Sequence, residues 1–324
     1  MDVVISNLLL TRCCPLKCEH CRIVRDYKGS PYPKVSSYGF LKPEQWLKIM
    51  DNLEALGCVF HTIYGGEPSL YPQLFSLVNM LNKRNKFYTF ITSGVEKEKW
   101  FKVQEQCGLK GISASVDIWA GDLGDREKKS RVGGEFLFEM KERGVKDVVA
   151  VTVLDEKNIQ TDDILEMVKL YSGRGIYVEI TLIDEPHNDY YDFAEPSDLG
   201  IKSPRKFSLL MDKLYDLKSR GFLIHNNEEF FTEAKRIVDG GVYMCKKPWS
   251  SMTVEPDGTI RLCYRIGGAK SRFHSALDFD KDRLLYHMSE DQFHFCKGCT
   301  WNCVVMSDSL SDKEERKKVF RHNQ

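Results

Sequence analysis

Short apolar runs alternate with amphipathic stretches from residue 1 to residue 185. The runs are rich in Val, Ile, Phe and Tyr, which favours β-strands, and they lie at Val3–Leu10, Phe60–Tyr64, Phe87–Thr92, Gly111–Val116, Val148–Leu154 and Tyr177–Ile183. The stretches between them predict helices at Pro43–Leu56, Tyr71–Lys83, Lys97–Gln106, Lys128–Arg143 and Asp162–Ser172. The acidic start at Asp162 and Asp163 predicts a capped N-terminus for the last of these helices. This alternation predicts an α/β fold with a parallel sheet, either open and doubly wound or a partial barrel.

The pattern changes after residue 185. Two helices are predicted between Lys206 and Gly240, and a hairpin is predicted over Ser250–Tyr264, where Pro256-Asp257-Gly258 is a strong turn signal. A short helix over Lys281–Gln292 and a charged end follow. We therefore expect four regions: a core at residues 1–185, a loop and helical connection at 186–240, a small α+β unit at 241–305 and a charged tail at 306–324.

Composition narrows the function classes. The chain has 324 residues, of which 42% are hydrophobic and 29% charged, as in ordinary globular proteins. The 47 basic and 47 acidic residues balance, which disfavours a general attraction to nucleic acid or anionic membrane. No apolar run approaches the roughly 18 residues of a membrane span, and no basic leader precedes the first apolar run. We therefore expect a cytoplasmic protein.

The cysteines are distributed unevenly. Of the 11 cysteines, Cys58 and Cys107 lie in apolar surroundings in the middle of the chain. The others form two dense groups, with Cys13, Cys14, Cys18 and Cys21 near the N-terminus and Cys245, Cys263, Cys296, Cys299 and Cys303 near the C-terminus. In a reducing compartment, such groups indicate metal sites and not a disulfide framework.

The N-terminal group follows directly after the first predicted strand. Thiolates bind iron–sulfur clusters, and the spacing of Cys14, Cys18 and Cys21 supplies three ligands from one loop. One iron of a four-iron cluster would then keep an open position for chemistry, as catalytic metals do. Two alternatives use the same segment: a zinc knuckle that includes His20, and a ferredoxin-type spacing that starts at Cys13. Either would make the chain an electron carrier or a zinc-stabilised binding protein.

Leu10-Thr11, followed by Cys14, Cys18 and Cys21 at the end of a first strand, resembles the signature loop of the radical S-adenosylmethionine (SAM) superfamily. The resemblance implies that the three cysteines hold a [4Fe–4S] cluster. It also implies that the amino and carboxylate groups of SAM chelate the fourth iron. Cys13 then lies outside the ligand set.

A second motif follows the second predicted strand. Gly65 and Gly66 allow the backbone to approach a ligand closely, Glu67 comes next, and Pro68 fixes the turn. Placed here, the four residues resemble the family motif that binds the methionyl amino group of SAM. The joint occurrence of this motif and the cysteine loop is the strongest signal in the sequence.

Two further strand ends match the family less specifically. Thr92 and Ser93 end the third strand, where relatives often carry a Thr-Asn-Gly turn, and Ser93 departs from that pattern. Ser115 and Asp117 end the fourth strand, where relatives often contact the SAM carboxylate or ribose. The resemblance implies SAM contacts at all four positions, although each hydroxyl could equally make a local turn bond.

The C-terminal cysteines are grouped around the predicted hairpin. Four cysteine ligands there also fit a tetrahedral zinc. The arrangement resembles the twitch appendage of the superfamily, a shortened SPASM domain with one auxiliary [4Fe–4S] cluster. The implied ligands are Cys245, Cys263, Cys296 and Cys299, with Cys303 as an alternative ligand.

The resemblance implies a partial (β/α)6 TIM-type barrel followed by a small α+β auxiliary-cluster domain. It implies an enzyme that cleaves SAM reductively to a 5′-deoxyadenosyl radical, which abstracts hydrogen from a substrate carbon. The electron would come from a flavodoxin or ferredoxin-type donor, and an auxiliary cluster favours oxidation of the substrate by dehydrogenation or crosslinking. Because no extra domain precedes the first strand, we expect a small-molecule or modified-nucleotide substrate. A peptide-modifying maturase (RiPP-type) and a redox-neutral radical isomerase remain alternatives.

Overall fold

Six parallel strands form the body of the protein in a computed structural model that describes residues 3–16, 40–116, 125–160, 162–183, 200–241, 250–261 and 272–278. These strands are β1 (Ile5–Leu9), β2 (Phe60–Tyr64), β3 (Tyr88–Thr92), β4 (Gly111–Ser115), β5 (Asp147–Leu154) and β6 (Tyr177–Leu182). The helices that follow them are α1 (Pro43–Glu54), α2 (Leu74–Lys83), α3 (Lys97–Cys107), α4 (Asp125–Glu142), α5 (Asp163–Gly173) and α6 (Pro204–Ser219), and α7 (Glu228–Val238) comes next. The predicted α/β alternation is therefore confirmed.

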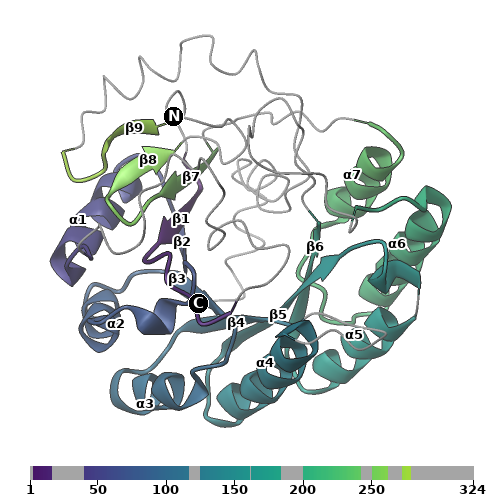
Figure 1. The fold of residues 1–324 in the computed structure, drawn as a ribbon, viewed down its shortest axis with the longest axis horizontal. Coiled ribbons are helices and arrows are strands. Elements are labelled where there is room, and N and C mark those ends of the chain that lie inside the picture. Colours follow the sequence, from purple (N-terminus) through teal and green to yellow (C-terminus); the bar gives the residue numbers. More distant parts are fainter. Residues whose placement is uncertain are drawn as a thin grey trace.

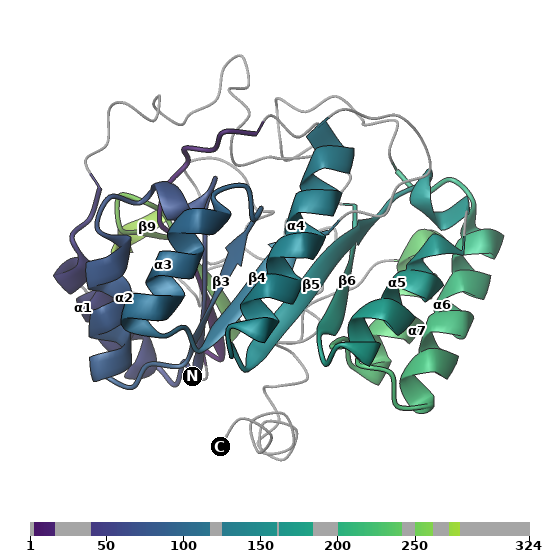
Figure 2. The same cartoon turned by 90° about the horizontal axis from the view of Figure 1, so that it is seen from below.

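The described strands form one sheet in the order β6-β5-β4-β3-β2-β1-β7-β8-β9. Figure 1 shows this sheet curving through space, with the helices along its outer side, and Figure 2 shows the same helices as a layer beside the strands. The last three strands are β7 (Ser251–Val254), β8 (Thr259–Arg261) and β9 (Arg272–Ser275), and β7 and β8 form the predicted hairpin. Strand β7 pairs in parallel with β1, with Leu8 opposite Val254, so the hairpin continues the same sheet.

The outer face of the sheet packs on the helices. Alternate residues of a strand point to opposite faces, and in β5 the fully buried Val148 and Ala150 belong to the same core as Trp100 and Phe136 of the helices. The intervening β5 residues, such as Val151, are only half-buried and face the inside of the curve. No helix within the described ranges is long and apolar enough to cross a membrane.

The start of α5 differs from the sequence-based expectation. Asp162 is the N-cap residue, but within the described part of the chain its side chain makes no capping bond. Its carboxylate instead accepts a hydrogen bond from Lys213 of α6, with Nζ and Oδ1 2.8 Å apart. Asp162 therefore accepts a hydrogen bond from Lys213 of the neighbouring helix, and not from the backbone N–H groups at the start of α5 as the sequence pattern predicted.

A buried polar cluster lies at the amino ends of β1 and β2. His61 is almost fully buried, and its Nδ1 lies 2.7 Å from Oγ of Ser6, while its Nε2 lies 3.0 Å from Oε1 of Glu54. Lys86 donates to the other oxygen of Glu54 over 2.6 Å. Burial alone lowers the pKa of His61, but its hydrogen bonds with Cys58 and Glu54 outweigh burial and raise this pKa to about 9. The serine–histidine–glutamate order resembles a hydrolase triad, but Ser6 is fully buried, so we assign the cluster to stability.

The raised pKa of His61 predicts a pH-dependent stability. The charged imidazole stabilises the fold fully below the unfolded value of about 6.5, and this contribution is lost as pH rises through about 9. At about 1.4 kcal/mol per pKa unit, the contribution is at most about 3–4 kcal/mol, and solvent screening at the partly exposed Glu54 reduces it. Urea unfolding of wild type and His61→Gln between pH 6 and 10 should show a stability difference that shrinks with pH. A difference that stays constant across this range would mean that folded His61 is neutral.

Candidate functional site

The loop after β1 carries the first predicted cluster ligand. The backbone N–H of Leu10 donates to the carbonyl of Tyr64 over 2.8 Å, which extends the β1–β2 pairing to the start of this loop. The N–H of Cys13 donates to Oγ1 of Thr11 over 3.0 Å, and the N–H of Leu16 points at Sγ of Cys14 over 3.4 Å. The loop therefore begins at the carboxyl edge of the parallel sheet, where α/β proteins commonly bind ligands.

This loop packs directly on the turn after β2. The N–H of Gly66 donates to the carbonyl of Thr11, and the N–H of Glu67 donates to the carbonyl of Cys13, both over 2.7 Å. A Cβ added at Gly66 would lie 2.1 Å from the Cys13 carbonyl oxygen, and one at Gly65 would lie 2.5 Å from that of Thr11. Glycine is therefore required at both positions by this backbone contact.

The carboxylate of Glu67 is buried and accepts four hydrogen bonds. Its Oε1 accepts from the N–H of Ser69 (3.2 Å) and from Oγ1 of Thr92 (2.6 Å). Its Oε2 accepts from the N–H and Oγ of Ser93, over 2.9 and 2.6 Å. Each oxygen thus has two donors, which fills the acceptor sites of an ionised carboxylate. The structure therefore brings together three residues that the sequence predicted separately, and Glu67 fixes the turn after β2 to the end of β3.

Thr92 faces α3. Besides donating to Glu67, its hydroxyl oxygen accepts from Nε1 of Trp100 and from the N–H of Gly94, each over 3.1 Å. One donor and two acceptor contacts are all that a hydroxyl can make. The fully buried indole of Trp100 thereby holds the end of β3 in place.

Ser115 ends β4 on the inner face of the sheet. Its neighbours Ile112 and Ala114 belong to the core under the helices, so the alternation turns Ser115 to the other side. Helix α4 passes close by, because a Cβ added at Gly133 would lie 2.6 Å from the carbonyl oxygen of Ser115. The end of β4 is therefore fixed by a close helix–strand contact.

The remaining predicted ligands stay predictions. The residues concerned lie outside the described ranges and are Cys18, Cys21, Asp117, Cys245, Cys263, Cys296, Cys299 and Cys303. Cys14 itself fits a cluster ligand. It is half-buried, lies at the carboxyl edge of the sheet and has a backbone N–H pointing at its sulfur, a kind of hydrogen bond that tunes cluster thiolates.

Sequence reasoning missed two charged residues at this site. Arg12 and Glu255 are 9% and 3% exposed, and Nη2 of Arg12 donates to Oε2 of Glu255. Glu255 directly follows β7, so this ion pair joins the cysteine loop to the C-terminal hairpin. The sequence held one signal for this pair, because Glu255 directly follows an apolar strand. A charged side chain at that position can be buried where the strand ends.

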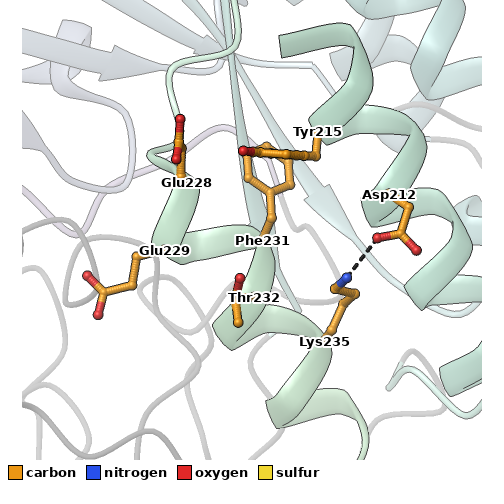
Figure 3. Close-up of a pocket in the computed structure, with 7 residues that line it drawn as sticks. All are labelled: Asp212, Tyr215, Glu228, Glu229, Phe231, Thr232 and Lys235. Atoms are coloured by element: carbon orange, nitrogen blue, oxygen red, sulfur yellow. Dashed lines mark hydrogen bonds and ion pairs between the residues drawn. The ribbon is translucent and has the colours of Figure 1, made fainter. Parts of the chain in front are cut away.

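A separate hollow of 450 Å³ lies between α6 and α7. Its aromatic lining is Tyr215 and Phe231, whose rings meet edge-on with centroids 5.6 Å apart. Figure 3 shows these rings beside the ion pair of Lys235 and Asp212, whose Nζ and Oδ1 are 2.7 Å apart. Of the predicted ligand residues that the structure describes, none lines this hollow.

The contact between the cysteine loop and the turn after β2 predicts that one methyl group added at Gly66 strongly destabilises the fold. Gly66→Ala should displace the loop at Cys13 and lower the free energy of unfolding by about 1–3 kcal/mol, as overpacking does. Gly173→Ala is the matched control, because a Cβ there meets no described atom within 4 Å and should be neutral or stabilise by up to about 1 kcal/mol. Urea unfolding of both variants measures the effects. Equal stabilities of the two variants would contradict the close contact.

Comparison with known proteins gives the family of this site. Residues 8–168 match the Radical SAM superfamily, and this segment contains Cys14, the turn from Gly65 to Pro68, and Ser115. The chain is 34% identical over 112 residues to an S-adenosylmethionine-dependent nucleotide dehydratase from Flammeovirga pacifica. That match covers 34% of this chain and 37% of the dehydratase, so the aligned segment spans little more than a third of that relative.

Two further proteins align with most of the chain, one by sequence and one by fold. A PqqA peptide cyclase from Ruegeria pomeroyi is 29% identical over 321 residues, which cover 94% of this chain and 76% of that protein. The crystal structure of SuiB from Streptococcus suis superposes with a TM-score of 0.66, covering 96% of this chain and 75% of SuiB. At 14% identity, the SuiB likeness concerns the fold alone. Residues 8–168, with the cysteine loop docked on the glycine turn, therefore form a radical SAM superfamily domain.

Proposed function

We propose that the chain is a radical SAM enzyme that cleaves SAM reductively and removes a hydrogen atom from a substrate carbon. The observation that carries the proposal is the docking of the Cys14 loop on the Gly65–Gly66 turn inside the matched domain. A [4Fe–4S] cluster held by Cys14, Cys18 and Cys21 would supply the electron that breaks a carbon–sulfur bond of SAM.

The described residues support distinct roles in this site. The backbone of the turn at Gly65, Gly66 and Pro68 would receive the methionyl end of SAM, as the resemblance to the family motif implies, while the space beside the two glycines is filled by the Thr11 and Cys13 carbonyls of the cysteine loop. Glu67 would hold this turn rigid through its four hydrogen bonds, which include those from Thr92 and Ser93. A rigid, preorganised turn lowers the cost of aligning the reacting groups.

Two further positions complete the proposed SAM site. Ser115 lies on the inner face at the end of β4, where its hydroxyl can donate to SAM, and Asp117 follows it in the sequence. Strands β2 and β4 lie on either side of β3 in the sheet, so the glycine turn and Ser115 share the carboxyl edge. The site thus combines ligand-binding groups from several strand ends, as parallel α/β enzymes do.

The C-terminal cysteines would hold an auxiliary [4Fe–4S] cluster. The proposed ligands are Cys245, Cys263, Cys296 and Cys299, with Cys303 as the alternative. The hairpin of β7 and β8 lies between the first two of these in the sequence, and its strand β7 pairs with β1, the strand that leads to Cys14. Such a second redox centre favours an oxidative outcome, dehydrogenation or crosslinking, with a flavodoxin or ferredoxin-type protein as electron donor.

The proposed substrate is a small molecule or a modified nucleotide. The 34% identity with a nucleotide dehydratase over 112 residues supports this class. A peptide is the second candidate, favoured by the alignment with a PqqA peptide cyclase over 94% of the chain. The fold of SuiB, which has also been solved with its precursor peptide SuiA bound, is in line with this second candidate.

Release of 5′-deoxyadenosine tests the proposal. Anaerobically reconstituted wild type should contain about eight irons, four per cluster, and should release 5′-deoxyadenosine from SAM when reduced with dithionite. Cys14→Ala should abolish release and halve the iron. Cys107→Ala is the matched control, since Cys107 lies on α3 away from the loop and should keep full release. Two zinc ions per chain with no SAM cleavage would instead establish a zinc-stabilised binding protein.

A further inference from the structure

His225 lies beside β6, the strand at one end of the described sheet (Figure 1). Residues 223–226 run alongside this strand, and the N–H of His225 donates to the carbonyl of Val178 over 2.8 Å. The amide side chain of Asn226 then bonds both the N–H and the carbonyl of Ile180, over 2.7 and 2.8 Å. The backbone at His225 is therefore fixed against β6.

The side chain of His225 lies on the inner face of the sheet. Val178 and Ile224 form a parallel bridge, and both belong to the core under the helices. Because alternate residues of a strand point to opposite faces, the next residues, Glu179 and His225, are both turned to the inner side. There Nδ1 of His225 lies 3.3 Å from Oε2 of Glu179, and the two form an ion pair.

This ion pair lies level with a proposed SAM contact. In the parallel register, Ser115 of β4 is opposite Val151 of β5, and Val151 is opposite Glu179 of β6. Adjacent strands are about 4.8 Å apart, so the backbones at Ser115 and Glu179 are roughly 10 Å apart along one row of the inner face. A substrate bound beside SAM at this face would therefore be within reach of the pair.

The surroundings of His225 differ from those of the structural His61. Both ring nitrogens of His61 are hydrogen-bonded, and its side chain is 1% exposed. The side chain of His225 is 37% exposed, and within the described ranges its Nε2 makes no hydrogen bond or ion pair. The ring of Tyr177 packs edge-on against it, with centroids 6.2 Å apart. The imidazole is therefore held at Nδ1 while Nε2 is accessible to a ligand.

The charges around His225 favour its protonated form. Burial alone lowers the pKa of His225, but the carboxylates of Glu179 and Asp147 outweigh burial and the nearby Lys218, and they raise this pKa. His225 is also the only basic residue in β4, β5, β6 and residues 223–226. Hydrogen bonds from a charged donor are roughly twice as strong as neutral ones, so an anionic oxygen is the expected ligand of Nε2.

We propose that His225, oriented by Glu179, is a substrate-binding residue whose Nε2–H donates to an anionic oxygen of the substrate on the inner face of the sheet. The expected source of this oxygen is a phosphate group, since a modified nucleotide is the first proposed substrate. The assignment to the substrate rests on the proposed function. The affinity for an anion does not, because it concerns only the chain itself.

Nuclear magnetic resonance of the metal-free, full-length chain with isotope-labelled histidine tests this affinity, and His225→Gln identifies the signal. Dimethyl phosphate and acetate both keep one negative charge from pH 6 to 10, and sodium chloride at equal ionic strength is the reference. An anion that prefers the charged imidazole should raise the titration midpoint of His225, by about one pH unit at ten times its dissociation constant. His61 is the internal control, because its buried ring should keep its midpoint near 9.

The two anions distinguish the sources of the oxygen. A larger shift with dimethyl phosphate would assign the site to a phosphate, and a larger shift with acetate would assign it to a carboxylate of a peptide. An unchanged His225 midpoint with both anions would overturn the proposal. An equal shift of His61 would also overturn it, because the shift would then be a general salt effect.

Glu179→Gln tests the positioning role of the carboxylate. Loss of its charge and of its charged hydrogen bond should lower the His225 midpoint below the wild-type value. Glu166→Gln is the matched control, because it removes a carboxylate from the exposed face of α5 and should leave the midpoint unchanged. A wild-type midpoint in Glu179→Gln would show that Glu179 does not orient the charged ring.

The same titration separates this inference from the proposed function. If wild type releases no 5′-deoxyadenosine but dimethyl phosphate raises the His225 midpoint, the proposed function fails and the anion site stands. If release occurs and neither anion moves the midpoint, the proposed function stands and this inference fails.

Discussion

Two backbone hydrogen bonds, from Gly66 to Thr11 and from Glu67 to Cys13, hold the cysteine loop on the turn after β2. They form because the two glycines carry no Cβ at points where one would lie 2.1 or 2.5 Å from a carbonyl oxygen. The contact fixes where Cys14 can lie relative to the carboxyl edge of the sheet. The other features of the site either support this contact or extend from it.

The support comes from buried polar groups. The carboxylate of Glu67 accepts hydrogen bonds from Ser69, Thr92 and Ser93, which ties the turn after β2 to the end of β3. Burying a carboxylate costs free energy unless its acceptor sites are filled, so losing any one of these donors weakens the whole network. On the opposite side, Arg12 and Glu255 join the loop to the hairpin that extends the sheet beyond β1.

Much of the fold followed from the sequence, because apolar runs rich in Val, Ile and Phe fix strands locally. The ends of elements moved by at most three residues, as at α2, predicted from Tyr71 and observed from Leu74. The pairing of β7 with β1 was not predictable, because an apolar run does not specify which sheet edge it joins. Likewise, motif spacing identified Glu67 and Thr92, but only the tertiary fold makes them partners.

The central claim is that the docked Cys14 loop holds a SAM-cleaving iron–sulfur cluster, and diffraction tests it most directly. Crystals of the anaerobically reconstituted protein with SAM, measured on both sides of the iron absorption edge, should show anomalous iron density next to Sγ of Cys14. The Gly66–Thr11 and Glu67–Cys13 hydrogen bonds should be intact in the same crystals. Zinc density at Cys14, or iron bound only near the C-terminal cysteines, would contradict the account.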